Sequence, residues 1–337
     1  MIAVDANGAD RGPRAVAEGV ARSKVACVVF GPAGELDACA GAAEIVDAPE
    51  YITGDEEPAL AVRSRPAASI VQAADAVASG RASALVSAGA TGAVLAAALL
   101  RIKRLRGVHR PALAVVLPTL ERPSVLVDAG ANADVRPEHL VQFAYLGACF
   151  ARACLGVERP RVGLLSVGEE RAKGSADVLE AHARLAERAE AGERAFDFHG
   201  NVEGFDVPRA TVDVVVTDGF TGNVALKVME STAAELGRAI RREIAAGPLA
   251  RFGGLLVRGR LRRLRERIDP ERIGGAILLG LRRPVIVAHG SFGPEGIASA
   301  VRLAQRAVDE RMVERTADAL ASAGVLRSAA GASVAAK

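Results

Sequence analysis

Residues 125–132 read Val-Leu-Val-Asp-Ala-Gly-Ala-Asn, and this passage from apolar to polar side chains predicts the fold. Three apolar residues in succession, two of them β-branched, are typical of a strand that is covered on both faces of its sheet. The glycine and polar side chains that follow predict a turn at the carboxyl end of that strand.

The same pattern recurs along the chain. Further strands are predicted at residues 2–4, 27–30, 84–86, 112–117, 162–165, 212–216 and 284–288. Between the strands lie Ala- and Arg-rich stretches with helical periodicity, such as residues 71–78 and 176–191. This alternation predicts an α/β fold with a doubly wound, mainly parallel sheet. We expect one domain over residues 1–327 and a flexible tail over residues 328–337.

The composition is that of an ordinary globular protein, with 337 residues, 50% hydrophobic and 25% charged. A net charge of +3 gives no electrostatic footprint for a nucleic acid, so we expect no such partner. The chain opens on a predicted strand without a signal sequence, and no apolar run is long enough to span a bilayer. These features predict a cytoplasmic location.

The four cysteines, Cys27, Cys39, Cys149 and Cys154, form no Cys-x-x-Cys pair. No histidine stands beside them at the spacing of a metal site. We therefore expect no bound metal and reduced thiols.

Residues 224–275 interrupt the alternation and predict a protruding helical hairpin. Its tip is apolar, with Leu255 and Leu256, and a basic stem follows. The stem carries Arg258, Arg260, Arg262 and Arg263. Such a hairpin suits contact with an anionic membrane surface or an acidic partner, or simply packing with a solvated arginine face.

Glycine-rich loops follow several predicted strands and suggest anion binding through backbone N–H groups. The candidate residues are Gly89, Thr91 and Gly92 in one loop and Asp218 and Gly222 in another. Neither loop is a Walker A sequence or has dinucleotide-binding spacing, and tight turns required by the fold are the alternative. Since ligands bind at the carboxyl ends of parallel strands, we expect these loops at one edge of the sheet.

Lys173 follows a predicted strand end together with Gly168 and Glu170. A lysine here can hold a phosphate or stabilise the negative charge that develops on a tetrahedral intermediate. The alternative is a solvated lysine paired with a neighbouring glutamate.

Three further polar residues follow strand ends. Asn223 is either the N-cap of a long helix or an amide donor to an oxygen. Asn132 is either a turn residue or a binding amide, and His289 is either structural or a donor or base. No Gly-x-Ser-x-Gly elbow or glycine-flanked cysteine offers a nucleophile, so direct attack by a bound anion is favoured over a covalent intermediate.

Long motifs in these loops resemble the bacterial phosphate acyltransferase family of phospholipid synthesis. Residues 87–93 read Ser-Ala-Gly-Ala-Thr-Gly-Ala, and residues 168–174 read Gly-Glu-Glu-Arg-Ala-Lys-Gly. The other motifs lie at residues 4–13, 110–114, 128–132, 136–143, 200–204, 218–227 and 288–291.

The resemblance implies a homodimeric, Rossmann-like α/β/α sandwich that uses no cofactor. It implies transfer of a fatty acyl group from acyl-acyl-carrier protein to inorganic phosphate, and a membrane glycerol-phosphate acyltransferase that consumes the acyl phosphate. The family's catalytic lysine and asparagine match Lys173 and Asn223. The hairpin would then contact the carrier protein or, transiently, the membrane surface.

Some positions depart from the family pattern. Ala90 stands where the family has an asparagine, and Phe292 stands where it has a second serine. These departures keep two alternatives open. One is a short-chain acyl-coenzyme A phosphotransacylase, and the other is a catalytically decayed homologue that docks on the carrier protein or the membrane.

Overall fold

The computed structural model describes residues 1–117, 119, 122–267 and 269–326, and these form one sheet of eleven strands. The strands are β1 Ile2–Asp5, β2 Cys27–Gly31, β3 Ala43–Asp47, β4 Ala84–Ser87, β5 Ala112–Leu117, β6 Ser124–Val127, β7 Arg161–Leu165, β8 Asp197–Val202, β9 Val214–Val216, β10 Ala276–Leu279 and β11 Val285–Val287. Their order across the sheet is β3-β2-β1-β4-β11-β10-β5-β6-β9-β7-β8. All eight predicted strands are confirmed, while β3, β8 and β10 were not predicted.

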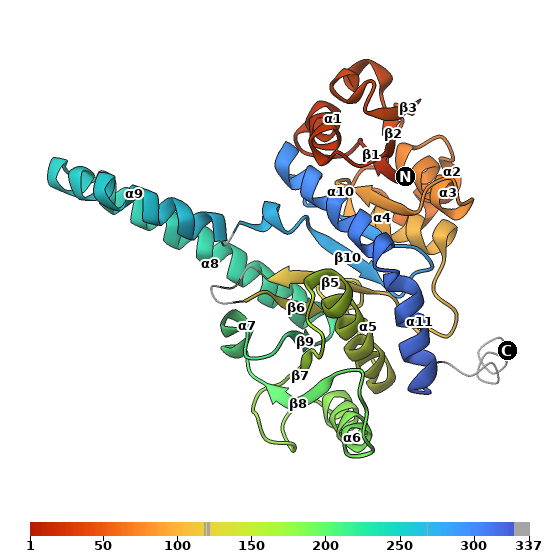
Figure 1. Cartoon of the computed structure of the whole chain (residues 1–337), viewed down its shortest axis with the longest axis vertical. Coiled ribbons are helices and arrows are strands. Elements are labelled where there is room, and N and C mark those ends of the chain that lie inside the picture. The colour runs from red at the N-terminus through yellow and green to blue at the C-terminus, as the bar shows by residue number, and fades with distance from the viewer. Residues whose placement is uncertain (118, 120–121, 268, 327–337) are drawn as a thin grey trace.

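Helices cover both faces of the sheet (Figure 1). They are α1 Gly12–Ser23, α2 Pro58–Ser64, α3 Ser69–Ala78, α4 Thr91–Ala97, α5 Pro137–Leu155, α6 Ala176–Glu190, α7 Asp206–Arg209, α8 Gly219–Ala245, α9 Pro248–Arg267, α10 Pro294–Asp309 and α11 Met312–Ser322. Short 3-10 turns span Ala33–Glu35, Asp37–Cys39 and Pro270–Arg272, and a π-helical turn spans Ala98–Ile102.

Two buried apolar clusters lie on the two faces of the sheet. One joins the strands to α1, α5, α6, α10 and α11, and the other joins them to α2, α3, α4, α7 and the start of α8. This is the predicted α/β/α sandwich. The division of the chain into domains stays a prediction.

The sheet reverses direction at its centre. Strands β1, β2, β3, β4 and β11 are parallel to one another, as are β6, β7, β8 and β9. The three pairings between β11 and β6, through β10 and β5, are all antiparallel, so the two sets run in opposite directions. The expectation that all the loops share one edge is therefore wrong, because the carboxyl ends of the two sets lie on opposite edges.

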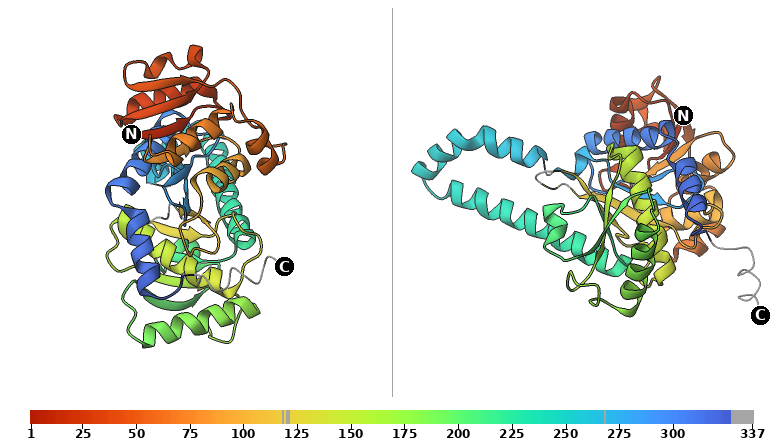
Figure 2. Two further views of the ribbon diagram at one scale, coloured as in Figure 1. Left: turned by 90° about the vertical axis from the view of Figure 1, so that its right-hand side faces the viewer. Right: turned by 60° about the horizontal axis from the view of Figure 1, so that its bottom comes forward.

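The hairpin is α8 and α9, which protrude from the body of the molecule (Figures 1 and 2). The two helices approach closely where Gly254 meets Ile244, because a Cβ at Gly254 would lie 2.4 Å from Ile244 Cγ2. The first turns of α8 pack on the sheet through Leu226 and Met229. Helix α8 begins at Gly219, five residues before the predicted start of the hairpin at residue 224.

Within the described part of the chain, no helix has the length and apolarity to cross a bilayer. The predicted flexible tail at residues 328–337 lies outside the described residues.

Candidate active site

Lys173 lies in a short loop after β7. Its backbone N–H donates to Glu170 O at 2.9 Å, and Ser166 Oγ donates to Lys173 O at 2.9 Å. The side chain passes over Gly168, where a Cβ would lie 2.9 Å from Lys173 Cγ. Lys173 is exposed, and no carboxylate of the described residues lies within ion-pair distance of its ammonium group. The alternative of a lysine paired with a neighbouring glutamate is therefore not observed.

Asn223 lies in the second turn of α8 and is not the N-cap. Asp218 is the N-cap, because its carboxylate accepts from Thr221 N at 2.8 Å and from Thr221 Oγ1 at 2.7 Å. The half-buried side chain of Asn223 faces Gly130, where a Cβ would lie 3.7 Å from Asn223 Oδ1. The N-cap alternative for Asn223 is thus wrong, and its amide makes no hydrogen bond within the described part of the chain.

The sheet register brings Lys173 and Asn223 to the same edge. Strand β9 lies between β6 and β7, with Val216 paired to both Val127 and Leu164. The loops that follow these three parallel strands are therefore neighbours. They carry Asp128 to Asn132, Gly168 to Gly174, and Asp218 to Asn223.

Asp128 organises the loop after β6. It is fully buried and accepts from Leu113 N at 2.8 Å, Ala131 N at 3.0 Å and Asn132 N at 2.7 Å. Burial raises the pKa of this carboxyl, and these hydrogen bonds oppose the rise. Gly222 is required beside it, since a Cβ there would lie 1.9 Å from Asp128 O.

The side chain of Asn132 makes its hydrogen bonds within the fold, to groups in and beside this loop. Its Nδ2 donates to Pro111 O at 2.7 Å and to Asp128 Oδ2 at 2.8 Å, so both amide hydrogens are used within the fold. Of the two alternatives for Asn132, the structure therefore favours the turn residue. The organising role of Asp128 was missed, although an acid directly after an apolar strand was a readable signal.

A second group of predicted residues lies on the opposite edge, after β4 and β11. Gly89, Thr91 and Gly92 follow β4, and His289 follows β11. The N-cap of α4 is Ala90, which makes no side-chain hydrogen bond, and Thr91 and Gly92 are exposed at this uncapped end. An uncapped helix start with exposed N–H groups suits an anion.

Asp5 holds this second group together. Its carboxylate accepts from Ser69 Oγ at 2.6 Å and Ser87 Oγ at 2.7 Å, and Ser87 Oγ accepts from Gly89 N at 3.1 Å. Burial raises the pKa of Asp5 to about 6, although these hydrogen bonds lower it. Asp5 was not among the predicted site residues.

His289 is exposed, and its ring is oriented by the neighbouring serine. Nδ1 accepts from Ser291 N at 3.2 Å and lies 2.8 Å from Ser291 Oγ. The neutral ring therefore carries its proton on Nε2, which makes His289 a hydrogen-bond donor at this edge.

One group of possible metal ligands occurs among the described residues: His109, Glu138 and His139, whose ligand atoms lie within 4.8 Å of one another. His139 Nδ1 accepts from Arg136 N at 3.0 Å, which places the ring proton on Nε2. Neither nitrogen of His139 then offers a lone pair to a metal, so this arrangement does not fit a metal site.

The fold is similar to that of the phosphotransacetylases. A phosphotransacetylase from Streptococcus pyogenes superposes with a TM-score of 0.60 at 18% identity, covering 95% of this chain and 94% of that one. A phosphotransacetylase from Staphylococcus aureus gives a TM-score of 0.56 at 16% identity, covering 95% and 94%. At these identities the likeness concerns the fold alone.

Sequence similarity gives the family. The model of the family described as "Fatty acid synthesis protein" matches residues 1–315. A phosphate acyltransferase of Thermobifida fusca is 46% identical, covering 94% of this chain and 89% of its own. One of Paracoccus denitrificans is 40% identical, covering 96% and 92%. The chain belongs to this acyltransferase family.

Proposed function

We propose that the chain transfers a fatty acyl group from the thioester of acyl-acyl-carrier protein to inorganic phosphate, forming an acyl phosphate for phospholipid synthesis. Acyl transfer to phosphate follows from the family and from relatives named phosphate acyltransferase at 40% and 46% identity. The observation that supports the chemistry is that Lys173 and Asn223 lie on neighbouring loops, and that neither side chain has a hydrogen-bond or ion-pair partner among the described residues.

In the proposed reaction, a phosphate oxygen attacks the thioester carbonyl carbon. A C–O bond forms, the C–S bond breaks, and the carrier thiolate leaves and takes a proton from solvent. Lys173 offsets the charge of the phosphate, and Asn223 donates to the oxyanion that develops on the carbonyl. Positioning and charge stabilisation suffice here, because phosphate is already an anionic nucleophile.

The remaining predicted site residues are proposed to shape the site or to bind the phosphate and the acyl donor. Gly168, Glu170 and Gly222 shape the edge that carries Lys173. Asp218 caps helix α8 through Thr221, and Asn132 bonds Pro111 O and Asp128 in the neighbouring loop. Gly89, Thr91, Gly92 and His289 form a second group of donors for the phosphate or the acyl donor. This second group lies on the opposite edge of the sheet from Lys173. We therefore assign it no contact with Lys173 in the proposed reaction.

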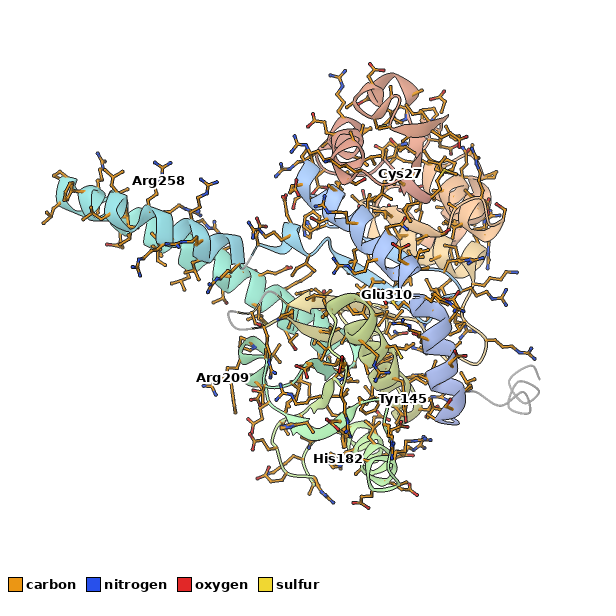
Figure 3. All side chains as sticks on the ribbon, in the orientation of Figure 1. Cys27, Tyr145, His182, Arg209, Arg258 and Glu310 are labelled. Atoms are coloured by element: carbon orange, nitrogen blue, oxygen red, sulfur yellow. The ribbon has the colours of Figure 1, made fainter. Side chains whose placement is uncertain are left out.

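The hairpin is proposed as the contact with the carrier protein or the membrane. Leu255 and Leu256, which lie on α9 about two turns beyond its start at Pro248, are 65% and 73% exposed. The arginines of the stem continue along α9, where Figure 3 labels Arg258 on the protruding arm. A homodimer in the cytoplasm, with transient contact at the inner face of the membrane, would deliver its product to a membrane glycerol-phosphate acyltransferase.

The decisive experiment measures acyl phosphate formation with acyl-acyl-carrier protein and with acyl-coenzyme A, each with and without phosphate. We expect phosphate-dependent product with the carrier-protein donor. Product from acyl-coenzyme A alone would favour the short-chain phosphotransacylase, and carrier binding without any product would favour the decayed homologue.

Lys173→Ala should lower turnover by about 10²–10³-fold, the usual cost of losing one group that stabilises negative charge in the transition state. The thermal unfolding midpoint should stay unchanged, because the Lys173 side chain is exposed and has no ion-pair partner among the described residues. Turnover close to that of the unmodified protein would defeat the assigned role.

A further inference from the structure

The end of β8 carries an amide that contacts the loop of Lys173. Asn201 is only 4% exposed, and its Nδ2 donates to Glu170 O at 2.9 Å and to Lys173 O at 3.2 Å. Only the nitrogen of the amide can face two carbonyl oxygens, so this geometry fixes the orientation of the side chain.

The two carbonyls belong to one tight turn. Glu170 O also accepts from Lys173 N at 2.9 Å, and Lys173 O also accepts from Ser166 Oγ at 2.9 Å. The backbone of Lys173 is therefore held at both its N–H and its carbonyl, while its side chain passes over Gly168. Asn201 ties this turn to the neighbouring strand, β8.

The other end of the amide argues against a role in stability alone. Asn201 Oδ1 is buried and has no hydrogen-bond partner within the described residues. An unsatisfied buried acceptor destabilises a fold by about 1–3 kcal/mol. The amide is thus a poor choice for packing, whereas its two donors match the two carbonyls of the lysine loop.

We propose that Asn201 is a positioning residue that sets the direction of the Lys173 side chain through the two carbonyl oxygens of its loop. The inference rests on the proposed function, because the catalytic role of Lys173 is itself proposed. Asn201 acts through the loop and needs no contact with the substrate.

The test is a double-mutant cycle of Asn201→Asp and Lys173→Ala, assayed for acyl phosphate formation. Asn201→Asp keeps the shape but places carboxylate oxygens against two carbonyls, so the turn is released. We expect kcat to fall by about 10-fold or more in the unmodified background, because small displacements of a catalytic group are costly. In the Lys173→Ala background the same change should alter kcat less than about 2-fold, since the group it positions is absent.

Two further variants keep the test decisive. Ser166→Ala removes one hydrogen bond to the same carbonyl from a partly exposed position, so it should fold and lower kcat to a smaller extent. Ser124→Ala is the matched control, because its buried hydroxyl donates to Val212 O at 2.9 Å at the amino ends of β6 and β9. It should reduce stability and leave kcat unchanged.

A second readout is independent of turnover. The rate at which an amine reagent labels Lys173, relative to Lys24, should change in Asn201→Asp and in Ser166→Ala but not in Ser124→Ala. Unchanged labelling, or an equal loss of kcat in both backgrounds of the cycle, would overturn the inference. Full turnover in Lys173→Ala would instead defeat the proposed function, so the two failures are distinguishable.

Discussion

One buried carboxyl group organises each of the two groups of loops: Asp128 on one edge of the sheet and Asp5 on the other. The titration of Asp5 should make the stability of the protein depend on pH. Its pKa of about 6 in the folded protein exceeds the ordinary value of 3.8 because the group is buried. Between about pH 4 and 6 the folded state holds a proton that the unfolded state has lost, so the free energy of unfolding falls as pH rises. Two pKa units correspond to about 3 kcal/mol.

Asp5→Asn should remove this contribution. Denaturant unfolding at several values between pH 4.5 and 7.5 should show that the difference in stability between the variant and the unmodified protein grows in favour of the variant up to about pH 6. Above that pH the difference should stay constant. A difference that does not vary with pH would show that Asp5 does not titrate in this range.

At the residue scale, the sequence could place Lys173 and Asn223 but not their surroundings. Both stand after apolar runs, which was enough to put them at strand ends. The N-cap role of Asp218 and the two hydrogen bonds of Asn201 depend on backbone contacts between loops. Those contacts join residues that are brought together only when the strands pair, so a local sequence pattern cannot predict them.

At the element scale, the exposed Leu255 on α9 allows a test of whether the hairpin contacts a membrane. Burying one leucine side chain contributes about 1.5–3 kcal/mol, so Leu255→Asp should weaken binding to vesicles with anionic lipids by about 10-fold or more. Flotation with such vesicles measures it. Leu60→Asp is the matched control, because Leu60 is 64% exposed on α2 and Leu255 is 65% exposed. Equal flotation of the two variants would contradict the proposed contact between the hairpin and the membrane.

Three strands escaped prediction for different physical reasons. Strand β3 is largely exposed at an edge, with the pattern Ala-Glu-Ile-Val-Asp, and β8 is the other edge strand and contains His199 and Gly200. Edge strands lack the continuous apolar run of a covered strand. Strand β10 is apolar but has only four residues, and it directly follows the segment 224–275 that was predicted as a helical hairpin.

At the scale of the whole molecule, the reversal of the sheet was only partly readable, because β10 takes part in it and was not predicted. Six residues separate β5 from β6 and five separate β10 from β11, which is too few for the crossover that a parallel pair requires. Short connections therefore implied antiparallel neighbours at the centre. Three successive antiparallel pairings reverse the strand direction between β11 and β6. The loops at the carboxyl ends of the two parallel sets therefore lie on opposite edges.

The exposed side of α8 bears on the assembly of the molecule. Val224, Val228, Leu236 and Ile240 are each between 42% and 59% exposed, and at 3.6 residues per turn they spread over a broad face of the helix. Several exposed apolar residues on one helix are typical of an interface, and the proposed homodimer would cover them. Sedimentation equilibrium should then give twice the mass of one chain.

Val228→Asp should shift this equilibrium toward the single chain, because a carboxylate would be buried without a partner at the interface. Leu60→Asp introduces the same charge at a similarly exposed leucine on α2, and it should sediment as the unmodified protein does. A Val228→Asp variant that stays dimeric would show that a different surface holds the copies together, and a single-chain mass for the unmodified protein would contradict the homodimer itself.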